Sequence, residues 1–162
     1  MAGLLKVTVA RRWWAVLVAA LIVAVPAAVS AEGPPSATGA GHSGAGDERR
    51  TFSFSAVTLP DGSATGSAQL FARGFPAKVH MEVTCIRVQG NVAYISGLNT
   101  SADPAVFEGI YAIFAVEDNG EGGVVDRITQ FHPAATQNAE ACLTESPGDF
   151  FPIEKGNVQV RA

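Results

Sequence analysis

The chain has 162 residues and a formal net charge of −4, and 48% of its residues are hydrophobic. This length is enough for one domain with a sizeable core. Its basic residues are scattered, and Arg49 with Arg50 is only a pair, so no basic patch favours binding to nucleic acid or anionic lipid. We therefore expect no nucleic-acid partner.

The N-terminus has the pattern of a secretory signal peptide. Residues 1–12 carry three bases and no acid, Trp13–Val25 is an unbroken apolar run, and Pro26 ends it. Val29 and Ala31 occupy the −3 and −1 positions of a cut after Ala31. The alternative is a retained membrane anchor, but the apolar run is shorter than the roughly 20 residues that a spanning helix needs. We expect residues 1–31 to be removed, which leaves a secreted, extracellular protein with a net charge of −7 and no membrane segment.

Residues 32–48 are rich in Gly, Ala, Ser and Pro and contain almost no large apolar side chain. Such a segment buries too little surface to offset the entropy of ordering. We expect a flexible tether here, followed by a single all-β domain over residues 49–162.

The two cysteines, Cys85 and Cys142, predict one disulfide because an exported chain folds in an oxidising compartment. Two buried thiols are the alternative. A metal site is disfavoured because neither cysteine lies in a CxxC pair or near a histidine, and no motif indicates a cofactor.

Apolar and polar residues alternate through much of the domain, which predicts short strands joined by turns. The strands are expected over residues 51–58, 64–72, 78–88 and 92–98, with turns at Pro60-Asp61-Gly62, Gly74-Phe75-Pro76 and Gln89-Gly90-Asn91. In the third strand Val79, Met81, Val83 and Cys85 share one face, so Cys85 is expected to point towards the core.

The second half of the domain continues in the same way. We expect a loop over 99–104, a strand over 106–117 that is apolar on both faces, a loop over 118–123, a strand over 124–131 and a closing strand over 157–161. No helical period is sustained. Seven or eight antiparallel strands joined mostly by tight hairpins form either an up-and-down barrel or a two-sheet sandwich. We favour the barrel because a meander closes most simply in that way.

Three stretches carry a family resemblance: Val83-Thr84-Cys85-Ile86-Arg87-Val88-Gln89-Gly90-Asn91-Val92-Ala93, Val116-Glu117-Asp118-Asn119-Gly120-Glu121 with Asp126-Arg127-Ile128, and Gly156-Asn157-Val158-Gln159-Val160. In them the chain resembles a group of small, mostly uncharacterised secreted proteins of high-GC Gram-positive bacteria. The resemblance extends from about Thr51 to the C-terminus and implies a β-rich domain. It supplies no activity, cofactor or catalytic residue.

The most distinctive polar feature is an acidic, glycine-rich loop that contains Asp118, Glu121 and Asp126. Several oxygen ligands on a flexible loop suit calcium, which makes these residues a candidate metal site. Their spacing does not match the twelve-residue calcium loop. The alternative is a hairpin connection in which the acidic side chains cap their own backbone.

His80 and Glu82 lie two residues apart on one predicted strand and so share a face. A carboxylate beside an imidazole raises its basicity, as in a general-base pair. No nucleophile motif accompanies the pair, and a solvated strand face is the competing interpretation.

Four aromatic residues, Phe71, Tyr94, Tyr111 and Phe131, are candidates to line a barrel interior that holds an apolar ligand, although they also suit an ordinary core. We expect a secreted, non-catalytic binding or interaction domain whose partner is a small apolar ligand or a surface protein. The alternatives are a small secreted β-barrel enzyme of hydrolase or isomerase type, and a structural protein associated with the cell envelope.

Overall fold

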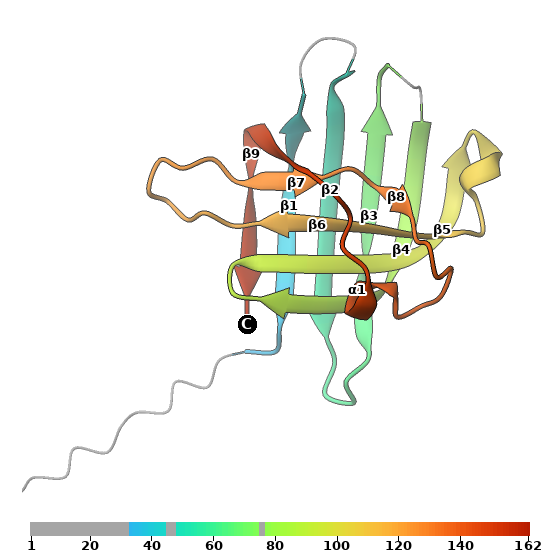
Figure 1. The fold of residues 1–162 in the computed structure, drawn as a ribbon, viewed down its shortest axis with the longest axis horizontal. Coiled ribbons are helices and arrows are strands. Elements are labelled where there is room, and N and C mark those ends of the chain that lie inside the picture. The colour runs from blue at the N-terminus through green and yellow to red at the C-terminus, as the bar shows by residue number, and fades with distance from the viewer. Residues whose placement is uncertain (1–32, 45–47, 75–76) are drawn as a thin grey trace, which may run out of the picture. The chain divides into compact units, whose positions relative to one another are not determined.

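A computed structural model describes residues 33–44, 48–74 and 77–162, which form a closed antiparallel β-barrel (Figure 1). The predicted signal peptide, residues 1–31, lies outside the described residues. Within the described ranges no helix is long and apolar enough to cross a membrane.

Eight strands build the barrel wall; each pairs with the wall strands before and after it in the chain, and the first, β1, pairs with the last, β9. They are β1 (Ser36–Ser43), β2 (Arg50–Thr58), β3 (Ala64–Ala72), β4 (Ala77–Gln89), β5 (Val92–Asp103), β6 (Tyr111–Glu117), β7 (Arg127–Thr129) and β9 (Phe150–Arg161). The order β5-β4-β3-β2-β1-β9-β7-β6 closes on itself because β5 also pairs with β6. The shorter elements are the 3-10 turn η2 (Ala105–Phe107), β8 (His132–Pro133) and the single helical turn α1 (Ala141–Thr144). The up-and-down meander barrel is confirmed, and the sandwich is not formed.

The prediction of a flexible tether over residues 32–48 is wrong for its central part. Residues 36–43 form β1, which pairs with β2 on one side and with β9 on the other and so completes the barrel. Its inward positions hold small residues because large neighbours already occupy the space. A Cβ on Gly39 would lie 2.6 Å from Cγ1 of Val158 and 2.9 Å from Cε1 of Phe54. The entropic cost of ordering β1 is thus offset by its hydrogen bonds to β2 and β9 and by its packing against the apolar side chains of these strands.

The core fills the barrel with inward-facing residues of all eight wall strands. It comprises Ala37, Phe52, Phe54, Ala56, Ala68, Met81, Val83, Ala93, Ile95, Ala112, Phe114, Val116, Ile128, Ile153 and Val158. Phe114 lies at its centre. The ring of Phe54 meets that of Phe114 edge-on, with centroids 5.4 Å apart, and Phe131 stacks on Phe114 at 4.1 Å. These aromatic contacts add to the free energy gained by burial.

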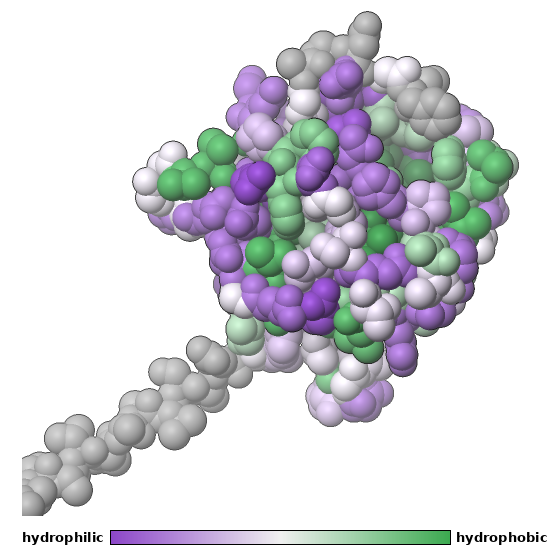
Figure 2. Space-filling view, viewed as in Figure 1, coloured by the Kyte–Doolittle hydropathy of each residue, from purple (hydrophilic) through white to green (hydrophobic). Residues whose placement is uncertain are grey.

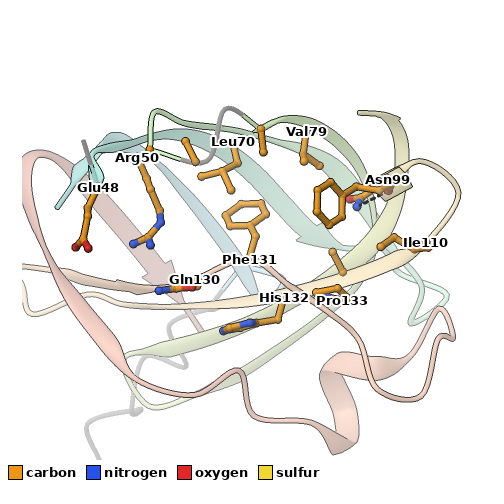
Figure 3. Close-up of a pocket in the computed structure, with 15 residues that line it drawn as sticks. Glu48, Arg50, Leu70, Val79, Asn99, Ile110, Gln130, Phe131, His132 and Pro133 are labelled. Carbon is orange, nitrogen blue, oxygen red and sulfur yellow. Dashed lines mark hydrogen bonds between the residues drawn. The ribbon is translucent and has the colours of Figure 1, made fainter. Parts of the chain in front are cut away.

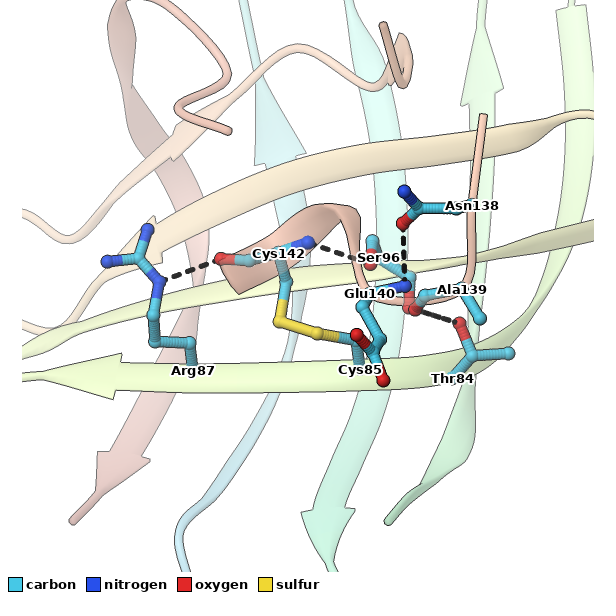
Figure 4. The surroundings of a disulfide bond; sticks show 8 residues. All are labelled: Thr84, Cys85, Arg87, Ser96, Asn138, Ala139, Glu140 and Cys142. Atoms are coloured by element: carbon cyan, nitrogen blue, oxygen red, sulfur yellow. Dashed lines mark hydrogen bonds between the residues drawn. A yellow bond between two sulfur atoms is a disulfide. The ribbon is translucent and has the colours of Figure 1, made fainter. Parts of the chain in front are cut away.

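The disulfide between Cys85 and Cys142 is confirmed, with a Cα–Cα distance of 5.9 Å, but it lies outside the barrel core (Figure 4). The prediction that Cys85 points towards the core is wrong because the strand pairing shifts by one residue next to it. Val83 pairs with Gly97 whereas Cys85 pairs with Ser96. Such a bulge resets the alternation of faces, and Cys85 therefore faces outwards and is covered by α1.

The segment that carries α1 covers the outer face of β4, β5 and β6. Three of the hydrogen bonds that fasten it lie close to the disulfide. Thr84 Oγ1 donates to the carbonyl of Ala139 at 2.8 Å, Arg87 Nε donates to the carbonyl of Cys142 at 2.7 Å, and the Cys142 N–H donates to Ser96 Oγ at 3.1 Å (Figure 4). A second, smaller core of Ile113, Ala134 and Ala141 lies beneath it, with Tyr111 at its margin. The strand predicted over 106–117 is confirmed only from Tyr111, because residues 105–107 form η2, and this cover explains why β6 is apolar on both faces.

Candidate functional site

A cavity of about 450 Å³ lies at one mouth of the barrel (Figure 3). The mouth is formed where β2 and β4 begin and where β3 and β5 end, with η2 and β8 beside them. The lining residues are Glu48, Arg50, Leu70, Ala72, Gly74, Ala77, Val79, Asn99, Phe107, Ile110, Ala112, Gln130, Phe131, His132 and Pro133.

Small inward side chains create this space. Ala72, Ala77 and Ala112 each place a single methyl group where larger residues would fill the barrel. Phe131 bounds the cavity towards the core, since its ring stacks on that of Phe114. Most of the wall is apolar, and Leu70 and Val79 complete its sides (Figure 3). A cavity with such a wall favours apolar ligands.

Asn99 is the buried polar residue of the cavity, with 3% of its surface exposed. Its backbone N–H donates to the carbonyl of Ile110 at 2.9 Å, and its carbonyl accepts from the N–H of Gly109 at 2.8 Å. Its side-chain Nδ2 donates to the carbonyl of Phe107 at 3.0 Å. Its Oδ1, in contrast, is buried and accepts no hydrogen bond. In the part of the chain that the structure describes, Arg49 Nε is the other such side-chain atom, and Arg49 does not line the cavity.

The remaining polar residues lie on the solvent side of the cavity. Glu48 is exposed, and Arg50, Gln130 and His132 are half-buried. Figure 3 shows Glu48 and Arg50 on the side opposite Asn99 and Ile110. One carboxylate and one guanidinium thus flank the entrance, while the buried side has a neutral amide.

The acidic loop lies at the opposite mouth of the barrel. Two of its carboxylates accept hydrogen bonds from backbone N–H groups. Asp126 accepts the N–H groups of Asn119 and Val158, and Asp118 accepts those of Gly120 and Val160, all at 2.9 Å. Glu121 is exposed. No group of three or more acidic, histidine or cysteine side chains able to hold a metal occurs among the described residues, which include this loop.

His80 and Glu82 do share a face of β4, but it is the outer wall of the barrel. Both side chains are exposed, and neither lines the cavity. The structure therefore separates this pair from the enclosed space in which a general base would act on a bound molecule.

Of the four aromatic residues considered as candidates to line the interior, Phe131 alone lines the cavity. Tyr94 and Tyr111 lie on the outer wall: the Arg87 guanidinium carbon lies 4.0 Å from the ring centroid of Tyr94, and Tyr111 packs against the outer core. Phe71 is 45% exposed. The presence of an aromatic side chain therefore does not indicate whether it faces the inside or the outside of the barrel.

The sequence-based interpretation missed Asn99 because it ended the strand at Leu98 and assigned 99–104 to a loop. The signal was present, since β5 continues the alternation Ala93, Ile95, Gly97 to Asn99 on the inward side. No family model matches the chain, and no curated protein or solved structure matches it significantly.

Proposed function

We propose that this is a secreted, non-catalytic binding protein that holds a small, mainly apolar ligand in the open mouth of its barrel. The observation that carries the proposal is the cavity of about 450 Å³ with its largely apolar wall. Small-molecule sites typically have volumes of about 300–1,000 Å³, apolar walls and a few polar groups. An eight-stranded barrel is just wide enough to hold one small ligand.

Secretion is supported by two features of the chain. Its N-terminal pattern is that of a signal peptide, and disulfides such as Cys85–Cys142 persist mainly in oxidising compartments. The resemblance to secreted proteins of high-GC Gram-positive bacteria points in the same direction.

A surface protein as partner has less support than a ligand in the cavity. Among the described residues, the exposed large apolar side chains belong to separate loops, to β3, to η2 and to α1: Leu59, Phe71, Val106, Val124, Val125 and Leu143. In Figure 2 the hydrophobic residues, in green, are separated by polar residues, in purple, across the viewed face. Docking surfaces for proteins are usually continuous apolar patches.

Titration with the fluorescent apolar probe N-phenyl-1-naphthylamine tests the proposal. Both tryptophans of the chain lie in residues 1–31, so a domain without that segment has no indole emission to interfere. We expect saturable enhancement with one site per chain. Ala72→Phe fills the cavity and should abolish the enhancement, whereas Ser67→Phe, on the exposed outer face of the same strand, should preserve it.

Circular dichroism and thermal unfolding of both variants establish that they remain folded. Absence of saturable binding to the wild-type domain, or equal binding by the two variants, would refute the proposal. Native mass spectrometry of the protein recovered from its host's culture medium complements the titration, because a stable added mass identifies the natural ligand.

A further inference from the structure

We infer that the ligand of this cavity is an apolar carboxylic acid whose carboxylate pairs with the guanidinium of Arg50 at the mouth of the barrel. The inference deepens the proposed function, on which it rests, by naming the chemical class of the ligand. It starts from the position of one side chain. Arg50 lines the cavity and is half-buried, whereas most arginines lie on the outer surface of a protein.

The alternation of β2 turns Arg50 into the barrel. Phe52 and Phe54, two and four residues further along this strand, both belong to the core. Because successive side chains of a strand point to opposite faces, Arg50 shares the inner face with them. Its cross-strand partner on β3 is Ala72, whose single methyl group leaves room for the long arginine side chain. Figure 3 shows this side chain extending from β2 towards Gln130, on the solvent side of the cavity.

The guanidinium of Arg50 has no anionic partner in the part of the chain that the structure describes. In that part the ion pair is the one between Arg127 and Glu117, at 3.3 Å. Glu48 also lines the cavity, but it is exposed and forms no ion pair with Arg50. The guanidinium carbon of Arg50 lies 5.8 Å from the ring centroid of Phe151. Such a ring contact uses none of the N–H groups in a hydrogen bond, so they stay available to a ligand.

These N–H groups are also accessible. Among the described residues, the buried side-chain atoms that lack a hydrogen bond are Arg49 Nε and Asn99 Oδ1. No guanidinium nitrogen of Arg50 is among them, although these nitrogens form no hydrogen bond with the described residues. They are therefore exposed rather than buried, and a ligand in the mouth reaches them without any rearrangement of the wall.

A guanidinium selects a carboxylate by charge and by shape. It is always protonated, and it presents parallel N–H groups that the two oxygens of a carboxylate accept together. A cation would be repelled by Arg50, and a pure hydrocarbon would leave the guanidinium without a partner. A phosphate monoester carries a second charge, but no second arginine or lysine is present among the described lining residues. The site consequently favours a single carboxylate.

The rest of the cavity suits the apolar part of such an acid. Leu70, Val79 and Phe131 line it with apolar surface, and the ring of Phe131 stacks on that of Phe114 in the core. The apolar part of the ligand is thus buried against these residues, while its carboxylate meets Arg50 at the mouth. Water at the mouth keeps the cost of desolvating the two charges low.

Displacement of N-phenyl-1-naphthylamine by decanoic acid and by decan-1-ol tests this inference. The two competitors have chains of the same length, but only the acid is charged at about pH 8. Both head groups stay at the mouth, so burial of the chain contributes equally to the two affinities. We expect the wild-type domain to bind decanoate about tenfold more tightly than the alcohol, as one charge-assisted pair predicts.

Arg50→Met keeps the apolar stem of the side chain and removes the charge, so it should abolish the preference for decanoate and leave binding of the alcohol unchanged. Arg73→Met is the matched control. It removes the same charge from an exposed position directly after β3, and Arg73 does not line the cavity, so the preference should remain. If Arg50→Met does not fold, a crystal structure of the wild-type complex decides: the decanoate oxygens should lie within about 3 Å of the guanidinium nitrogens of Arg50.

The outcomes separate the two proposals. Failure of the wild-type domain to bind the fluorescent probe overturns the proposed function and the inference together. If the probe binds, three results overturn the inference alone and leave the cavity as a general apolar site. These are no displacement by decanoate, displacement by the alcohol that is at least as strong, and a decanoate preference that survives Arg50→Met.

Discussion

The carboxylate of Asp126 accepts the backbone N–H of Val158 through Oδ2 at 2.9 Å, and both residues are buried. Its other oxygen accepts the N–H of Asn119 at 2.9 Å. One side chain thus ties the loop after β6 to the last strand of the barrel, 32 residues further along the chain.

Replacement of that carboxylate should destabilise the fold. Asp126→Asn keeps the shape but turns an NH2 group towards one of the two N–H donors, so we expect the free energy of unfolding to fall by about 2 kcal/mol. Urea denaturation measures the change. Glu121→Gln, an exposed residue of the same loop, is the control and should have little effect. Equal stability of the two variants would contradict the assigned role of Asp126.

Calcium should leave the melting temperature of the domain unchanged at about millimolar concentration, the range of weak extracellular calcium sites. The reason is that the carboxylates of Asp118 and Asp126 already accept backbone N–H groups, which a bound ion would have to displace. Thermal unfolding with calcium and with a chelator checks this. A clear rise with calcium would restore Asp118, Glu121 and Asp126 as a metal site.

The position of β1 in the wall can be tested at Gly39. Gly39→Val would drive its side chain into Val158 and Phe54, and overpacking of this kind costs about 1–3 kcal/mol. Ala40→Val adds comparable bulk on the exposed face of the same strand and should be nearly neutral. Chemical denaturation compares the two variants. If both were neutral, residues 36–43 would behave as the flexible tether that their composition suggests.

The disulfide should contribute much of the stability of the domain. Its cysteines are 57 residues apart, and the chain-entropy model assigns about 4 kcal/mol to a closed loop of this length. We expect the double variant Cys85→Ala, Cys142→Ala to unfold at a lower guanidinium concentration, and its segment around α1 to be cut first by a protease. A midpoint equal to that of the oxidised wild type would refute this expectation.

Stability at acidic pH should depend on Glu145. The side-chain hydrogen bond from Thr136 is the main cause that lowers the pKa of Glu145 below its ordinary value of 4.5, assisted by the backbone N–H groups of Thr136 and Ala135. A lowered pKa in the folded state stabilises the fold above pH 4.5, and this stabilisation is lost as the pH falls through the lower folded-state value.

Glu145→Gln should therefore be less stable than the wild type near neutral pH and should approach it as the solution becomes more acidic. Urea denaturation over a pH series measures the convergence. Glu140→Gln, an exposed carboxylate of the same segment, is the control. A difference between Glu145→Gln and the wild type that stays constant with pH would contradict the assignment.

The sequence alone determined the strands that alternate regularly, and with them the class of fold. The strand predicted over residues 64–72 coincides with β3, and that over 51–58 is one residue shorter than β2. Period-two alternation is a local property of a half-buried strand, so it can be read without knowledge of the neighbours. The sequence also determined that Cys85 pairs with Cys142, because two cysteines allow only one intramolecular bond.

The tertiary structure alone decided what the small or irregular residues do. Residues 36–43 form a strand because they pair with β2 and β9, and side chains of these two strands fill the space in front of Gly39 and Gly41, which is a relation between strands. Cys85 faces outwards because a bulge shifts the pairing beside it. Asn99 lines the cavity because β5 continues beyond Leu98. Each of these depends on how one strand packs against another, and composition and local periodicity do not record that.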